Sequence, residues 1–235
     1  MSESPHDLTP EERPAGSRLE GWEPAACAIP CFETPRFARL LSMRSVGASI
    51  GRPRWVFGYG SLMWYPGFAT PETRPARLHG WHRAFCIYSE HYRGTPDQPG
   101  LILGLLPGGS CRGLAHRLPA QRYDAVRRYL IRREIDNDGV YAETIRPIHL
   151  DDGRTVEALV YLADRQHRQF AGEQPLARAV SLVRRSRGAT GSNLAYVQNT
   201  VAHLVELGLR DRPLEELARL ASSSDAPRRR RKSPG

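Results

Sequence analysis

Short apolar segments separated by turn residues dominate the chain from residue 54 to residue 118. Strand-like segments occupy residues 54–59, 78–92, 101–106 and 112–118. They are interrupted by Pro96, by Pro99-Gly100 and by Pro107-Gly108-Gly109, and such residues are typical of turns between strands. The pattern predicts an antiparallel sheet, with residues 107–109 as a turn between two of its strands.

After Pro119 the apolar residues take the spacing of a helix. Tyr123, Val126 and Leu130 fall on one face of a predicted helix that ends near Glu134. Strands are predicted again over residues 140–150 and 155–163, joined by an acidic, glycine-containing hairpin turn at residues 151–153. Helices follow over residues 175–187, 192–209 and 213–221, and Ser192 or Asn193 can cap the second of these.

Strands that come mostly before helices indicate an α+β fold. We expect a mainly antiparallel β-barrel or sheet flanked by helices. Residues 1–53 mix Pro, Gly, Glu and Arg with little periodicity, and they are predicted to be a partly disordered extension and linker. Residues 54–221 form the predicted folded domain, and residues 222–235 a basic, disordered tail.

Composition narrows the class of protein. No segment approaches the roughly 20 apolar residues of a membrane span, and the N-terminus has no secretory pattern, so we expect a cytoplasmic protein without membrane contact. The four cysteines lack paired metal-site spacing and are expected to be reduced thiols. Lys232, in the predicted tail, is the sole lysine, which argues against a catalytic lysine in the folded domain.

The positive charge is unevenly distributed along the chain. Of the formal net charge of +9, residues 222–235 carry +4 and residues 1–50 carry −2, which leaves +7 for the middle. A basic domain attracts anionic ligands but does not identify its chemistry. The run at residues 228–232 has two interpretations, a nucleic-acid or membrane contact and a solvated tail. We favour the solvated tail, and therefore expect no nucleic-acid partner.

A glycine-containing turn directly after an apolar strand predicts a ligand site. Gly58 and Gly60 lie in the run from Trp55 to Trp64, and glycine lets backbone N–H groups approach a ligand closely. The third glycine of a dinucleotide fingerprint is missing, because Met63 stands at its position. Ser61 also lacks the glycine two places later that a hydrolase nucleophile elbow uses.

Several motifs follow this turn: Arg93-Gly94-Thr95-Pro96, Pro99-Gly100, Arg132-Arg133-Glu134, Tyr141, and Gly191-Ser192-Asn193 with Tyr196. From about residue 55 to residue 209, their order and spacing resemble those of the ChaC-type glutathione-specific γ-glutamylcyclotransferases. The chain departs from the family pattern in having Tyr92 before Arg93, where histidine is common, and in a longer, more acidic segment after Glu134.

The resemblance implies a site and a reaction. It assigns catalysis to Glu134, a small-molecule substrate, glutathione, and products 5-oxoproline and cysteinylglycine, with neither a cofactor nor a metal. The predicted substrate contacts are Val56, Phe57, Gly58, Tyr59, Gly60, Ser61, Leu62, Arg93, Tyr141 and Tyr196. Without the resemblance, the three tyrosines among these are as readily core aromatics as pocket residues.

The chemistry of a γ-glutamyl amide explains why a single carboxylate can suffice. The substrate carries its own nucleophile, the α-amino group, so the protein needs a base that later acts as an acid, and donors for an oxyanion. Glu134 lies at a helix end, where the helix dipole disfavours its charged form, and in a partly dry site its pKa should rise. Arg132 and Arg133 oppose this rise if they lie close to the carboxylate. Backbone N–H groups of residues 60–62 are the expected oxyanion donors.

Alternatives remain open at the level of sequence. Glu134 can be an ordinary helix-end ion-pair residue, in which case Glu143 or Glu157 is the next candidate, while Glu90 is expected to face solvent. His79 and His82 lie in a strand-like run and are not expected to bind a metal. The substrate can also be another γ-glutamyl compound, or the chain can be a non-enzymatic, basic module that binds nucleic acid.

Overall fold

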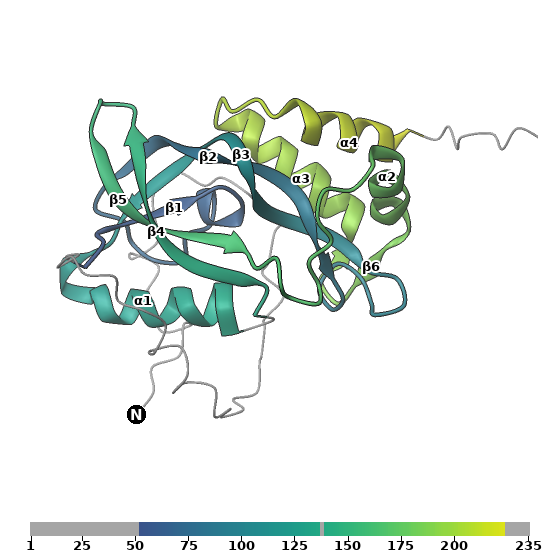
Figure 1. Cartoon of the computed structure of the whole chain (residues 1–235), viewed down its shortest axis with the longest axis horizontal. Coiled ribbons are helices and arrows are strands. Elements are labelled where there is room, and N and C mark those ends of the chain that lie inside the picture. Colours follow the sequence, from purple (N-terminus) through teal and green to yellow (C-terminus); the bar gives the residue numbers. More distant parts are fainter. Residues whose placement is uncertain (1–51, 137–138, 224–235) are drawn as a thin grey trace, which may run out of the picture.

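A closed β-barrel forms the centre of the molecule (Figure 1). The structure is a computed structural model that describes residues 52–136 and 139–223. The barrel has the strand order β1-β3-β2-β4-β5, with β1 at Trp55–Gly58, β2 at Thr73–Ser89, β3 at Gly100–Arg117, β4 at Tyr141–Leu150 and β5 at Thr155–Ala163. The neighbouring strands are antiparallel except β1 and β5, whose parallel pairing closes the barrel.

Strand β3 is longer than the sequence pattern predicted. The predicted turn at residues 107–109 is wrong, because β3 runs through these residues and pairs with β2 along nearly its whole length. Gly80, Gly108 and Gly109 have φ values of +81°, +102° and +68°, and the β2–β3 register shifts between His79 and Trp81. Glycines that tolerate positive φ thus accommodate a bulge inside one long hairpin instead of ending the strands.

Helices cover two sides of the barrel (Figure 1). Helix α1 (Tyr123–Ile131) lies on one side, and it continues into a π-helical turn at Arg132–Asp136. On another side lie α2 (Leu176–Arg185), α3 (Asn193–Glu206) and α4 (Arg212–Ser222), and the short strands β6 (Arg187–Gly188) and β7 (Gly191–Ser192) pair just before α3. No helix in residues 52–136 or 139–223 is long and apolar enough to cross a membrane.

The start of α3 is attached to the barrel by two different residues. Ser192 is the cap, since its hydroxyl oxygen accepts a hydrogen bond from the Ala195 N–H at 3.2 Å. Asn193 does not cap the helix. Its side chain instead bonds both the N–H and the carbonyl oxygen of Leu101 in β3, each at 2.8 Å, and thereby sets the position of α3 against the barrel.

Helix α1 is held to the barrel by an apolar cluster and an ion pair. The cluster includes Val56, Leu130 and Tyr161. At its edge the Glu143 carboxylate binds the Arg127 guanidinium through both oxygens and accepts a hydrogen bond from the Tyr161 hydroxyl at 3.0 Å. This attachment determines where the π-helical turn, and Glu134 within it, meets the barrel.

Candidate functional site

The turn after β1 forms one wall of a pocket. Ser61–Met63 make a single 3-10 turn, in which the Met63 N–H donates to the Gly60 carbonyl oxygen at 2.9 Å. A Cβ at Gly58 would lie 3.1 Å from the backbone and Cβ of Leu62, so glycine lets the turn fold back tightly onto its own strand. Gly58 therefore serves the packing of the turn.

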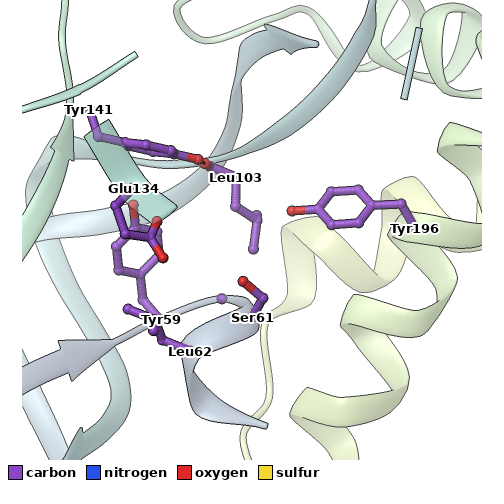
Figure 2. A pocket seen from close by; sticks show the side chains of 8 residues that line it. Tyr59, Ser61, Leu62, Leu103, Glu134, Tyr141 and Tyr196 are labelled. Atoms are coloured by element: carbon purple, nitrogen blue, oxygen red, sulfur yellow. Dashed lines mark hydrogen bonds between the residues drawn. The ribbon is translucent and has the colours of Figure 1, made fainter. Parts of the chain in front are cut away.

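The pocket has an empty volume of about 330 Å³, part of which is open to solvent (Figure 2). Its lining comes from five parts of the chain: the turn after β1, β3, the π-helical turn, β4 and α3. The lining residues are Tyr59, Gly60, Ser61, Leu62, Leu103, Glu134, Tyr141 and Tyr196. Figure 2 shows Glu134 and Tyr59 on one side of the pocket and Tyr196 pointing in from the opposite side.

Glu134 is a largely buried carboxylate with one cationic neighbour. Its side chain is 15% exposed, and its Oε1 lies 2.9 Å from Nε of Arg133. Burial raises the pKa of Glu134 above its ordinary value, and the charge of Arg133 opposes that rise. We predicted the direction of this shift from the helix end and a partly dry site, and in the structure desolvation is its largest cause.

Two tyrosines of the pocket donate their hydroxyl protons to backbone carbonyls. Tyr59 donates to Tyr161 at 2.8 Å, and Tyr141 donates to Leu103 at 2.6 Å. Burial raises the pKa of both phenols well above the ordinary value, and the nearby Glu134 carboxylate adds to this. Both phenols are therefore neutral at physiological pH, and each phenol oxygen can still accept a hydrogen bond from a ligand.

Tyr196 is held in place from two sides. Its ring packs edge-to-face on Phe85, with 6.0 Å between the two ring centroids. The guanidinium carbon of Arg93 lies 5.1 Å from the centroid of the Tyr196 ring. Arg93 is anchored in turn by a 2.7 Å bond from Nη1 to the carbonyl oxygen of Thr190. Burial lowers the pKa of Arg93, but the guanidinium remains charged at neutral pH.

Comparison with known proteins identifies the family. The family model described as ChaC-like protein matches residues 54–223, which are most of the chain. The chain belongs to the ChaC-like family. The glutathione-specific gamma-glutamylcyclotransferase of Escherichia coli (strain K12) is 38% identical over 165 residues, covering 70% of this chain and 71% of that protein. The Schizosaccharomyces pombe protein of the same name is 32% identical, covering 61% and 78%.

The ChaC-like fold is also found among solved structures. A crystal structure of the yeast γ-glutamyl cyclotransferase specific to glutathione superposes with a TM-score of 0.65 at 22% sequence identity, covering 73% of this chain and 96% of that one. A second yeast structure of that description gives a TM-score of 0.63 at 23% identity, covering 72% and 98%. These likenesses confirm the predicted α+β barrel flanked by helices.

Most of the predicted contacts of the ChaC-like domain line the pocket, and some do not. Tyr59, Gly60, Ser61, Leu62, Tyr141 and Tyr196 line it together with Glu134. Val56 and Phe57 are fully buried in separate apolar clusters, and Arg93 lies behind Tyr196. Leu103 was missed by sequence reasoning, because nothing in an apolar strand marks which residue will face a cavity.

Two of the other three acidic candidates of the ChaC-like domain have structural partners, and the third is exposed. Glu143 is bound by Arg127 and Tyr161, and Glu90 pairs with Arg168. Glu157 is exposed on β5. Within residues 52–136 and 139–223, no cluster of three or more His, Cys, Asp or Glu side chains could hold a metal ion.

Proposed function

We propose that this ChaC-like protein is a glutathione-specific γ-glutamylcyclotransferase, which converts glutathione into 5-oxoproline and cysteinylglycine. The observation that carries the proposal is the buried Glu134 carboxylate in the wall of a pocket that the Gly60–Leu62 turn also lines. The names of the Escherichia coli and Schizosaccharomyces pombe relatives support it. We further propose a cytoplasmic location, as expected from the sequence.

The reaction needs a folded substrate conformation more than it needs a protein nucleophile. The α-amino nitrogen of the γ-glutamyl group attacks the γ-carbonyl carbon, and the C–N bond to cysteine breaks as the five-membered lactam forms. Holding these two atoms in contact lowers the barrier by up to about 7–11 kcal/mol. A small pocket that encloses the γ-glutamyl group between the turn and Glu134 serves this purpose.

Glu134 acts as base and then as acid. Its carboxylate removes a proton from the substrate ammonium, which makes the nitrogen nucleophilic, and it gives that proton to the departing cysteine nitrogen as the C–N bond breaks. The ring nitrogen becomes positively charged on attack and loses a second proton to the freed carboxylate or to water, which leaves the neutral lactam. A pKa raised towards the working pH suits both steps, because the group must accept and release a proton in one cycle. Proton transfer of this kind contributes typically 10²- to 10⁴-fold in rate.

Backbone N–H groups of the turn stabilise the tetrahedral oxyanion. The first N–H groups of a helical turn have no acceptor within that turn. In the Ser61–Met63 turn the Met63 N–H is already bonded to Gly60, which leaves those of Ser61 and Leu62 for the substrate oxygen. Each well-aimed donor contributes roughly 3–4 kcal/mol to such a transition state.

The remaining predicted contacts divide between the two halves of the substrate. Tyr59 and Tyr141 lie beside Glu134 and face the γ-glutamyl group, while Tyr196 faces the cysteinylglycine half. Arg93, stacked behind Tyr196, places a positive charge on the side where the glycine carboxylate of glutathione leaves the pocket. Val56, Phe57 and Gly58 act by supporting the turn.

Incubation of the full-length protein with glutathione and EDTA tests the proposal directly. We expect equal amounts of cysteinylglycine and 5-oxoproline, both measured by mass spectrometry. No product at high enzyme concentration would overturn the glutathione assignment, and loss of activity on chelation would contradict a metal-free reaction. Turnover of a panel of other γ-glutamyl amino acids distinguishes a glutathione-specific enzyme from a cyclotransferase with another substrate. A nucleic-acid-binding module would instead bind nucleic acid with an affinity that falls steeply with salt concentration.

A further inference from the structure

The Arg133 guanidinium contacts two residues that line the pocket, Ser61 and Glu134. Nη2 donates to the Ser61 hydroxyl at 2.8 Å, and Nε lies 2.9 Å from Oε1 of Glu134. Nη1 donates to the carbonyl oxygen of Tyr65 at 2.6 Å and to the Tyr129 hydroxyl at 2.9 Å. One side chain thus joins the turn after β1, helix α1 and the π-helical turn.

We propose that Arg133 is a positioning residue for the reaction, whose guanidinium holds the Ser61 turn and the Glu134 carboxylate in one fixed geometry. The inference rests on the cyclotransferase function proposed above. It adds a residue that is not among those lining the pocket.

The shape of the side chain explains why arginine is needed. A guanidinium is planar and presents its donors as a rigid fork, so the groups bonded to it cannot move independently. The Tyr65 and Tyr129 rings lie 5.7 Å and 6.0 Å from the guanidinium carbon and restrict the plane further. The Arg133 side chain is only 17% exposed, so little water competes for these bonds.

The charge of Arg133 matters as much as its shape. Burial favours the protonated form of Glu134, and Arg133 is the group that opposes this. Without the cation, burial would act unopposed and would shift the carboxyl group towards its protonated form, which cannot act as a base. Arg133 therefore favours the ionised form of the base and also holds it in position.

The other titratable groups around Glu134 and Arg133 do not change charge near neutral pH. The phenols are raised in pKa by burial, and burial lowers the pKa of the histidine near Arg133 to about 4. These groups, from the turn after β1, α1, α3 and the barrel strands, are Tyr59, Tyr129, Tyr141, Tyr161, Tyr196 and His116. The acidic limb of the pH profile accordingly reports Glu134.

Two substitutions separate the charge from the fork. Arg133→Lys keeps a cation but cannot reach Ser61 and Glu134 with one rigid group, so kcat should fall on the order of 100-fold, as for an active-site displacement of about 1 Å, with the acidic limb near its original pH. Arg133→Met removes both, so kcat should fall at least as far and the acidic limb should move to higher pH. Both are read from cysteinylglycine release over pH 5–9.

Two further variants complete the experiment. Arg132→Met is the matched control, since Arg132 is an exposed neighbour in the same π-helical turn, and it should leave kcat and the pH profile unchanged. Ser61→Ala removes the hydroxyl that accepts a hydrogen bond from Nη2 of Arg133. It should therefore lower kcat and leave the acidic limb of the pH profile at its original pH. Circular dichroism and thermal melting establish which variants are folded.

The outcomes distinguish this inference from the proposed function. If the unmodified protein releases no cysteinylglycine, the function itself fails. If it is active and folded Arg133→Met matches it in kcat and acidic limb, the positioning role is overturned. If Arg133→Met does not fold, Arg133→Lys and Ser61→Ala decide. Full activity in both, or unfolding of both Arg133 variants, would reduce Arg133 to a structural residue.

Discussion

The buried Arg83 side chain donates from Nε to the carbonyl oxygen of Tyr59 at 2.5 Å, in the residue directly before Gly60. Its Nη1 donates to Oδ2 of Asp211 at 2.9 Å, and the two side chains are 4% and 15% exposed. A buried cation is thus neutralised by the residue that caps α4 and is bonded to the backbone beside Gly60. This arginine therefore fixes the backbone at Tyr59, where the pocket turn begins.

Removing this buried cation should destabilise the fold. Arg83→Met leaves Asp211 buried without its partner, and breaking a buried pair in this way costs about 3–5 kcal/mol. Urea denaturation should show that loss in the free energy of unfolding. Arg219→Met, which breaks an exposed pair with Glu216, is the control and should leave the denaturation midpoint nearly unchanged. A loss below about 1 kcal/mol for Arg83→Met would contradict the role assigned to the buried pair.

Replacing Glu134 by glutamine should abolish catalysis and preserve the fold. Glutamine nearly keeps the shape of the side chain, and its oxygen can still accept a bond from Arg133, but it cannot take up a proton. We expect kcat to fall by about 10²- to 10⁴-fold, with 5-oxoproline binding retained in calorimetry. Glu157→Gln, on the exposed face of β5, is the matched control. Near-normal turnover of Glu134→Gln would return Glu134 to the role of an ion-pair residue.

The activity should fall as the pH falls through the pKa of Glu134. The base must be ionised to accept a proton, and burial raises its pKa above the ordinary value, so the acidic limb of kcat should lie above the pH expected for an exposed glutamate. A pH titration of kcat between pH 4 and pH 9 measures the limb. An acidic limb below about pH 4, well under the ordinary glutamate range, would show that the carboxyl group is not desolvated during the reaction.

Glu143 should matter for stability and little for catalysis. It accepts hydrogen bonds from Arg127 and Tyr161 and lies outside the pocket lining. Glu143→Gln weakens bonds to a charged partner, so we expect the free energy of unfolding to fall by about 1–3 kcal/mol and kcat to change by only a few-fold. Thermal melting and turnover of the same sample test both parts. A collapse of kcat with unchanged stability would place Glu143 in the chemistry.

Much of the fold was readable from local patterns. The strand predicted over residues 155–163 has the bounds of β5, and Ser192 was one of the two predicted caps of α3. The glycine turn after β1 was also found by its composition. These features depend on neighbours in the chain, since a strand face, a helix cap and a tight turn each involve only a few consecutive residues.

Other features arose only from contacts between distant segments. The continuity of β3 through residues 107–109 follows from its pairing with β2, and a local turn signal could not reveal it. Leu103 faces the pocket because the barrel closes around it, and Asn193 bonds Leu101 in place of capping its helix. The sequence alone favoured the wrong role or none in each of these cases.

The site shows the same division. The glycine turn from Gly58 to Gly60 was marked as a ligand site by its composition, whereas Glu134, Tyr141 and Tyr196 were assigned to the site by the resemblance to the ChaC-type family. That Arg133 binds Ser61, 72 residues away, and that Arg83 binds Tyr59 were decided by the tertiary structure. An arginine in a sequence has many possible partners, and only the packing of the barrel, α1 and α4 selects the groups its guanidinium reaches.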